Sequence, residues 1–183
     1  MTGASVLALG PLAAHARKLG LAADRQAQWS AISALLEAAF GHKLFTALVH
    51  LEAHRLMKRL HTSDENISPL GGFKATGNGP WSRLVLQEGR IYVASNEDDV
   101  RTVFSEAPML IERGLHSALN IPVWHEGRVI GSLNMLGARH AYDNADHDLA
   151  AVIGGLCAPV FIEEMRAAQA AAEAVDRSAL DSV

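Results

Sequence analysis

The feature that most constrains this fold is a pair of alternating runs, residues 115–124 and 128–136, with Glu126 and Gly127 between them. In both runs nearly every second residue is apolar, which is the period of a β-strand. A Glu-Gly pair between two such runs favours a tight turn, so we predict an antiparallel hairpin. The alternation places Val129 on the apolar side and Ile130 on the mixed side. The apolar side must be covered by other elements.

Residues 44–53 alternate in the same way, with an apolar side and a mixed side, and residues 55–62 predict a further strand. Helical spacing predicts a helix over 11–19 and a stronger one that Asp24 caps and Gly41 ends. A last helix should begin at Asp143 or Asn144, and we expect Pro159 to kink or divide it. Such helices carry apolar stripes that could cover the apolar side of the sheet.

The stretch between these strands and the hairpin is the least regular. Residues 62–80 are rich in glycine and proline and predict a long loop, a class of segment that is often functional. We expect a short helix over 81–87, a strand over 90–94 and helical turns over 98–104 and 108–113. The mixed side of the sheet carries His, Asn, Ser and Thr rather than Lys and Glu, which suits a partly enclosed cavity. The segment from Gly71 to Trp81 is the candidate roof.

Composition excludes several classes of protein. The 183 residues carry a net charge of -4 and no basic run, which argues against a nucleic-acid partner. The lone Cys157 excludes an intramolecular disulfide and a Cys-Cys metal site. Neither a signal peptide nor a membrane-spanning apolar run is evident, so we expect a cytoplasmic protein with no membrane partner.

The hairpin run GLHSALNIPVWHEGRVIGSLNML, residues 114–136, resembles the closing hairpin of GAF domains. The runs PLGGFK (69–74) and PWSRLVLQEGRIYV (80–93) are similar to a stand-alone bacterial GAF subgroup. The resemblance implies an α/β (α+β) fold: a central antiparallel sheet of five or six strands, terminal helices on one face and a ligand pocket with short helices and loops on the other. We assign residues 24–165 to this domain, 1–23 to an N-terminal helical extension and 166–183 to a C-terminal helical tail.

The resemblance implies a domain that binds a small effector and forms homodimers through its terminal helices. GAF-type methionine sulfoxide reductases and bilin-binding GAF domains use pocket cysteines, and Cys157 falls on the last helix instead, where a buried structural thiol is the preferred interpretation. We therefore expect a sensory or regulatory domain with no cofactor and no catalytic residue. Two alternatives stay open: a small enzyme with His116 or His50 as general base, and a pure interaction module.

Candidate ligand-binding residues come from the mixed side and from the roof. They are Thr46, His50, Lys74, Trp81, His116, Asn120, Ser132 and Asn134. The polar residues of the hairpin need hydrogen-bond partners in the interior of the protein, which either a ligand or a covering helix would supply. Trp81 either stacks on a flat ligand or anchors its helix in the core. The alternation of His50, Glu52 and His54 would suit a metal site, but a polar strand end is the preferred interpretation.

Overall fold

The computed structural model describes residues 7–173. The outer parts of the predicted extension and tail, residues 1–6 and 174–183, lie outside the described residues. Within the described range, no helix has the length and apolar character needed to cross a membrane.

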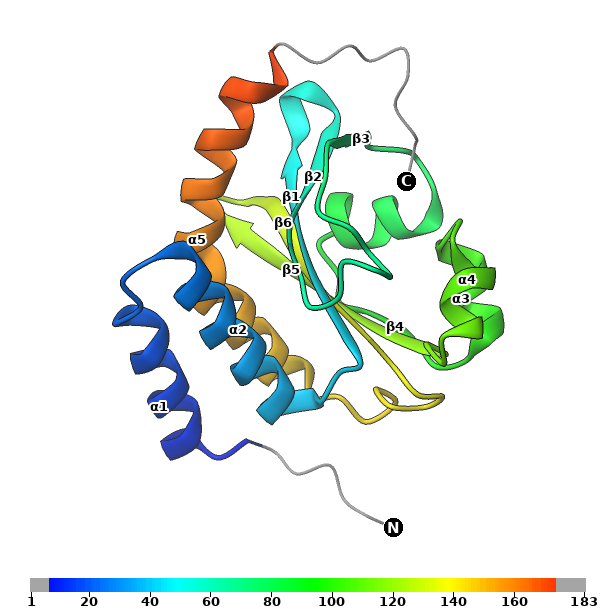
Figure 1. Cartoon of the computed structure of the whole chain (residues 1–183), viewed down its shortest axis with the longest axis horizontal. Coiled ribbons are helices and arrows are strands. Elements are labelled where there is room, and N and C mark those ends of the chain that lie inside the picture. The colour runs from blue at the N-terminus through cyan, green and yellow to red at the C-terminus, as the bar shows by residue number, and fades with distance from the viewer. Residues whose placement is uncertain (1–6, 174–183) are drawn as a thin grey trace.

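The centre of the molecule is a six-stranded antiparallel sheet in the order β3-β2-β1-β6-β5-β4 (Figure 1). Its strands are β1 (Leu44–Leu51), β2 (Leu56–Thr62), β3 (Phe73–Ala75), β4 (Tyr92–Ala94), β5 (Ser117–His125) and β6 (Arg128–Gly137). The predicted hairpin is β5–β6, and Glu126 and Gly127 both take a positive φ in its turn, at 48° and 75°. The sheet and its helices confirm the predicted α+β fold.

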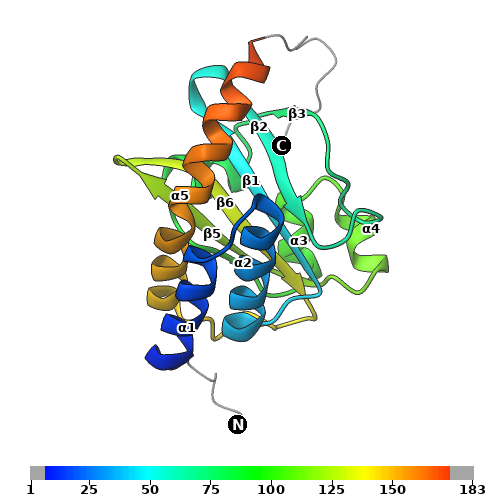
Figure 2. The ribbon, with the colours of Figure 1, turned by 60° about the vertical axis from the view of Figure 1, so that its left-hand side comes forward.

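Three helices lie on one side of the sheet: α2 (Arg25–Phe40) and α5 (His147–Ala172), with α1 (Leu9–Gly20) packed against α2 (Figure 2). Asp24 caps α2 as predicted, because its carboxylate accepts from the Ala27 N–H at 2.8 Å. Ile32 and Leu36 of α2 are fully buried and pack with Phe45 of β1 and with Phe161 of α5. This apolar layer is the main core, and it occupies the sheet face opposite the predicted pocket.

The last helix begins later than predicted. It begins after Asp146, whose carboxylate accepts from the Asp148 and Leu149 N–H groups at 3.0 Å, and not at Asp143 or Asn144. Asp143 instead accepts a hydrogen bond from His140 in the preceding turns. Pro159 lies inside the helix and does not divide it. The helix also continues across the predicted domain boundary at residue 165.

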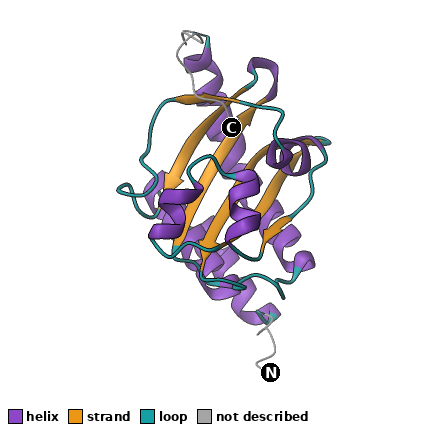
Figure 3. Ribbon diagram, turned by 90° about the vertical axis from the view of Figure 1, so that its right-hand side faces the viewer, coloured by secondary structure: helices purple, strands orange, loops and turns teal. Residues whose placement is uncertain are grey.

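Short elements cover the other face of the sheet (Figure 3). They are the π-helix η2 (Ser82–Gln87) and the helices α3 (Glu97–Val103) and α4 (Ala107–Glu112), and α4 lies close to the predicted turn 108–113. The long segment 62–80 is less irregular than predicted, because Phe73–Ala75 forms β3 and pairs with Leu56–Lys58 at the edge of the sheet. The composition of this segment indicated only a loop, and pairing with β2 overrides that local preference.

A β-bulge corrects one part of the predicted alternation. The β5–β6 pairing shifts near the tip of the hairpin and leaves Ile130 without a partner on β5. Ile130 packs in the core beneath the long helices, whereas Val129 packs with Trp81 and Met57 on the opposite face. The predicted faces of Val129 and Ile130 are therefore wrong, since one extra residue inverts the alternation towards the tip.

Two adjacent glycines on α5 give a matched test of how closely this helix lies on the sheet. A Cβ on Gly154 would lie 2.9 Å from the Pro122 carbonyl oxygen, whereas a Cβ on Gly155 would have no neighbour within 4 Å. Both substitutions by alanine gain about 1 kcal/mol of helix propensity. We expect Gly155→Ala to stabilise the protein by up to that amount and Gly154→Ala to destabilise it by about 1–2 kcal/mol. Urea unfolding of both variants checks this, and equal effects would contradict the close packing.

Candidate functional site

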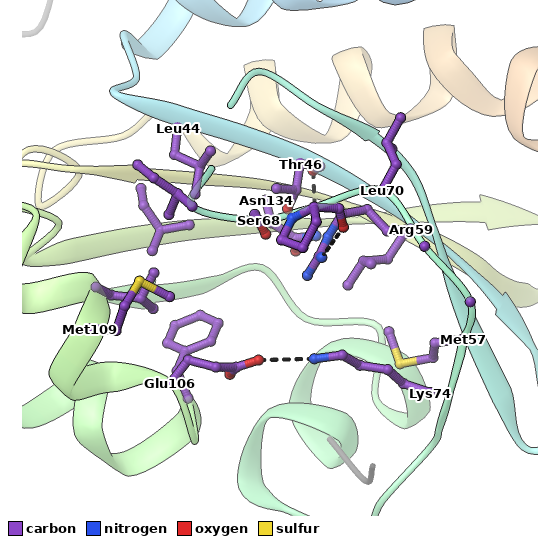
Figure 4. Close-up of a pocket in the computed structure, with 18 of the residues that line it drawn as sticks. Leu44, Thr46, Met57, Arg59, Ser68, Leu70, Lys74, Glu106, Met109 and Asn134 are labelled. Atoms are coloured by element: carbon purple, nitrogen blue, oxygen red, sulfur yellow. Dashed lines mark hydrogen bonds and ion pairs between the residues drawn. The ribbon is translucent and has the colours of Figure 1, made fainter. Parts of the chain in front are cut away.

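A cavity of about 510 Å³ lies on the sheet face opposite the long helices (Figure 4). The sheet supplies its floor through side chains of three neighbouring strands: Leu44, Thr46 and Leu48 of β1, Met57 and Arg59 of β2, and Asn134 and Leu136 of β6. The alternation of β1 explains this floor, because the residues between these three point into the core on the other face. The cavity therefore lies on the mixed side that the sequence predicts.

Two segments enclose the cavity above the sheet. The first is the loop 67–72 with Phe73 and Lys74 of β3, and the second is the region of α4, through Phe104, Glu106, Met109 and Leu110. Asp64 shapes the start of the loop, since its carbonyl accepts from the Ser68 N–H at 3.0 Å and its carboxylate from the Asn66 N–H at 2.9 Å. Trp81, at the N-terminal end of η2, completes the lining.

Polar contacts fasten the loop to the sheet and to α4. Arg59 donates through Nη1 to the Pro69 carbonyl at 2.7 Å, and Arg113 donates to the Asn66 carbonyl at 3.3 Å. Lys74 Nζ lies 2.9 Å from Glu106 Oε1 and so joins β3 to the start of α4 (Figure 4). These contacts hold together segments that lie far apart in the sequence.

The electrostatics of the cavity are set by these same groups. Burial lowers the pKa of the Arg59 guanidinium, with a smaller opposing effect from Glu106. Burial by itself would raise the pKa of Glu106, but the Lys74 hydrogen bond and charge help to bring it below its usual value. The lowered pKa keeps Glu106 ionised at neutral pH, and its ion pair with Lys74 is half-exposed at the edge of the cavity.

Four of the eight predicted ligand-binding residues line the cavity: Thr46, Lys74, Trp81 and Asn134. The structure brings them together from β1, β3, the start of η2 and β6. Trp81 is 3% exposed and packs with Val85 and Met57, so it anchors its helix and also borders the cavity.

Asn120 and Ser132 lie outside the lining although they are on the predicted face. Both are fully buried, and the helix η2 contacts the two strands that carry them. The Asn120 amide donates to Asn134 Oδ1 at 2.8 Å. The helix η2 thus covers these two residues, and Asn134 accepts from the Asn120 amide, whereas Asn120 Oδ1 and Ser132 Oγ are buried without a hydrogen-bond partner among the described residues.

His116 and His50 also lie outside the lining. His116 precedes β5, and its Nδ1 lies 2.9 Å from Glu97 Oε1 at the start of α3. His50 borders a second cavity of about 380 Å³ near the hairpin tip, together with Thr76, Trp124 and Arg128. Burial lowers the pKa of His50, so its imidazole is neutral at pH 7.

The alternation that suggested a metal site does not exist in the fold. Strand β1 ends at Leu51, and Glu52–His54 form a single 3-10 turn, η1, that ends at Arg55 in the left-handed conformation. His50, Glu52 and His54 therefore do not share one strand face. Within residues 7–173, no group of three His, Cys, Asp or Glu side chains is arranged to hold a metal ion.

Sequence reasoning missed the charged groups of the cavity other than Lys74. Arg59 lies in the polar strand 55–62, whose alternation is broken by a bulge opposite Ala47 and Leu48, so its face could not be read reliably. Glu106 and the apolar residues of α4 lie in a segment whose sequence pattern does not indicate that it packs over the sheet. Cys157 is fully buried on α5, across the sheet from the cavity, and burial raises the pKa of its thiol to about 12.

Comparison with known proteins finds a matching family model and several solved structures with a similar fold. A family model described as GAF domain matches residues 24–161. No curated protein matches the chain. Among solved structures, the GAF domain of a Coxiella burnetii phosphoenolpyruvate-protein phosphotransferase is 17% identical, with a TM-score of 0.63 over 87% of this chain and 94% of that one. A type II free methionine-R-sulfoxide reductase from Thermoplasma acidophilum is 18% identical, with a TM-score of 0.60 over 76% and 92%. The chromophore-binding domain of an R. palustris bacteriophytochrome is 12% identical, with a TM-score of 0.57 over 86% and 61%.

Proposed function

The chain belongs to the GAF domain family, and from this premise we propose that it is a sensory or regulatory domain that binds a small molecule in the cavity above β1, β2 and β6. The observation that carries the proposal is the cavity itself. Its volume of about 510 Å³ falls within the roughly 300–1,000 Å³ of typical ligand pockets. Its lining is mostly apolar with a few polar groups, which is the composition expected of such a pocket.

A structural neighbour with the same fold supports the proposal that this chain binds a small molecule, since the R. palustris structure is a chromophore-binding domain. In this chain a ligand in the cavity would contact the loop 67–72 and the helix α4 at the same time. A ligand that binds one arrangement of these segments more tightly than another would shift the balance between them, which is how a domain without chemistry of its own passes on a signal. The predicted homodimer through the terminal helices stays a prediction.

The enzymatic alternative has less support from the cavity. Among the described residues that line it, no histidine is present, so neither His50 nor His116 is placed to act there as a general base. The reductase neighbour keeps a catalytic role open for the fold. In this chain the thiol of Cys157 lies across the sheet from the cavity.

Filling the cavity with a larger side chain should weaken ligand binding. A thermal-shift screen of the full chain against a metabolite library identifies ligands, and calorimetry gives their affinity. We expect Met109→Trp to weaken each true ligand at least tenfold, because Met109 lines the cavity and the larger ring takes up its space. Glu112→Trp is the matched control, since Glu112 lies exposed on the same helix outside the lining. Ligands that bind both variants equally, or a library that gives no shift, would contradict the proposal.

A further inference from the structure

Resting on the proposed binding function, we propose that the cavity takes an amphipathic monoanion: a compound with an apolar body and one carboxylate-like group that pairs with Arg59. Three lining residues carry charge, and they are Arg59, Lys74 and Glu106. Lys74 and Glu106 neutralise each other at 2.9 Å. The lining is left with a net single positive charge, and that charge resides on Arg59.

Arg59 is held in the cavity wall without an acidic partner. Its side chain extends from β2 beneath the loop 67–72, and Nη1 donates to the neutral Pro69 carbonyl (Figure 4). Its Nε is buried with no hydrogen-bond partner. Among residues 7–173, no carboxylate lies within ion-pair distance of the guanidinium, and Glu106, whose charge it feels, is committed to Lys74. Arg59 is partly buried, and a partly desolvated cation without a counter-ion carries a cost that an anion in the cavity would offset.

The geometry of a guanidinium selects the chemistry of the anion. Arginine binds planar carboxylates through two parallel hydrogen bonds, and such charge-assisted bonds are about twice as strong as neutral ones. Asn134 adds a donor on the adjacent floor, because its amide nitrogen makes only long contacts of 3.5 Å with the Thr46 and Ser132 carbonyls. The anionic group is therefore expected above β1, between Arg59 of β2 and Asn134 of β6.

The remaining lining fits an apolar body. Aliphatic, aromatic and thioether side chains make up most of it: Leu44, Leu48, Met57, Phe73, Met109 and Leu136 are examples from five elements. A second negative charge on the ligand would meet no free cation while the Lys74–Glu106 pair is intact. A compound with one anionic end and one apolar end thus matches both parts of the cavity.

Two isosteric probes test this inference on the full chain. Naphthalene-2-carboxylate and naphthalene-2-carboxamide share an apolar body and differ in charge, and naphthyl-2-phosphate adds a second charge. By calorimetry at low salt we expect the carboxylate to bind at least tenfold more tightly than the amide and more tightly than the phosphate. Arg59→Gln should bring the carboxylate and the amide to within about twofold of each other.

Arg113→Gln is the matched control. It also removes an arginine that donates to a carbonyl of the same segment, but Arg113 is not part of the lining. It should leave the tenfold preference intact. Circular dichroism checks that each variant folds. If Arg59→Gln does not fold, Arg59→Lys keeps the charge and should keep part of the preference, and the comparison of probes on the unaltered protein still decides.

The outcomes separate this inference from the proposed function. Equal binding of carboxylate and amide to the unaltered protein, or tighter binding of the phosphate, would overturn the monoanion and leave cavity binding standing. A preference that survives Arg59→Gln would overturn the role of Arg59. If neither probe binds, the ligands found by the metabolite screen decide: neutral or cationic ligands overturn the inference, and a screen without any ligand overturns the proposed function itself.

Discussion

Replacing Gly131 with alanine is expected to destabilise the protein by about 3 kcal/mol, although the substitution adds one methyl group. A Cβ on Gly131 would lie 2.4 Å from the Leu48 carbonyl oxygen and 2.6 Å from the ring of Phe161. The ring of Phe161 can turn aside, but the carbonyl belongs to the backbone of the central strand β1. Removing a glycine from a strand normally gains about 0.5–1 kcal/mol, and this gain is too small to offset the separation of β1 from β6.

The matched control is Gly137→Ala at the other end of β6. There a Cβ would meet only side chains, with Tyr142 Oη nearest at 3.0 Å, so we expect a cost below about 1 kcal/mol. Urea unfolding followed by circular dichroism measures both variants. A Gly131→Ala protein as stable as Gly137→Ala would show that β1 and β6 separate easily, which would contradict the tight central pair.

Replacing Asn120 with aspartate is expected to cost about 3 kcal/mol or more at pH 7, and most of that cost should vanish in acid. Asn120 is fully buried and its amide donates to Asn134 Oδ1 at 2.8 Å. An ionised carboxylate of the same shape cannot donate that bond and loses its hydration. A protonated carboxyl can donate, so burial should raise the pKa of the introduced group in the folded state.

The sign of the pH dependence follows from linkage. With the folded-state pKa raised above the unfolded value of about 3.9, the folded state binds more protons between the two values. The stability of Asn120→Asp should therefore fall as pH rises through this interval, by up to about 1.4 kcal/mol per pH unit relative to the unaltered protein. Asn120→Leu is the control, because it removes the same hydrogen bond without adding a titrating group, and its cost should not vary with pH. A pH-independent difference for Asn120→Asp would show that water reaches this position.

The two faces of the sheet could be predicted from the sequence more completely than the residues that line the cavity. The alternation around Thr46 and Asn134 predicted the cavity floor, because β1 and β6 are regular where these residues lie. It failed for Val129 and Ile130, where a single bulged residue inverts the faces, and no local pattern marks a bulge in advance. The sequence also placed the cap of α5 at Asp143 or Asn144 instead of Asp146, because aspartate and asparagine are all favoured caps and three of them lie within four residues.

The pairing of Lys74 with Glu106 shows why the rest of the site could not be predicted. The two residues are 32 positions apart and belong to short elements whose places depend on the completed sheet. The sequence pattern also gave no indication of Arg59, because a lone arginine in a polar strand cannot be distinguished from a solvent-exposed surface arginine. Whether such a charged residue is available to a ligand depends on which opposite charges the fold places beside it.

The strand order also governs when the cavity can come into existence. The central pair joins Thr46 to Asn134, which are 88 residues apart in the chain. A chain emerging from the ribosome can form α2 and the β1–β2 hairpin early, yet β1 stays without its second neighbour until β6 has been made. Closing so long a loop before its contacts form is slow, as in other folds dominated by distant pairings. The edge of β1 that pairs with β6 thus stays unpaired until β6 has been made, and the cavity floor is among the last surfaces to be assembled.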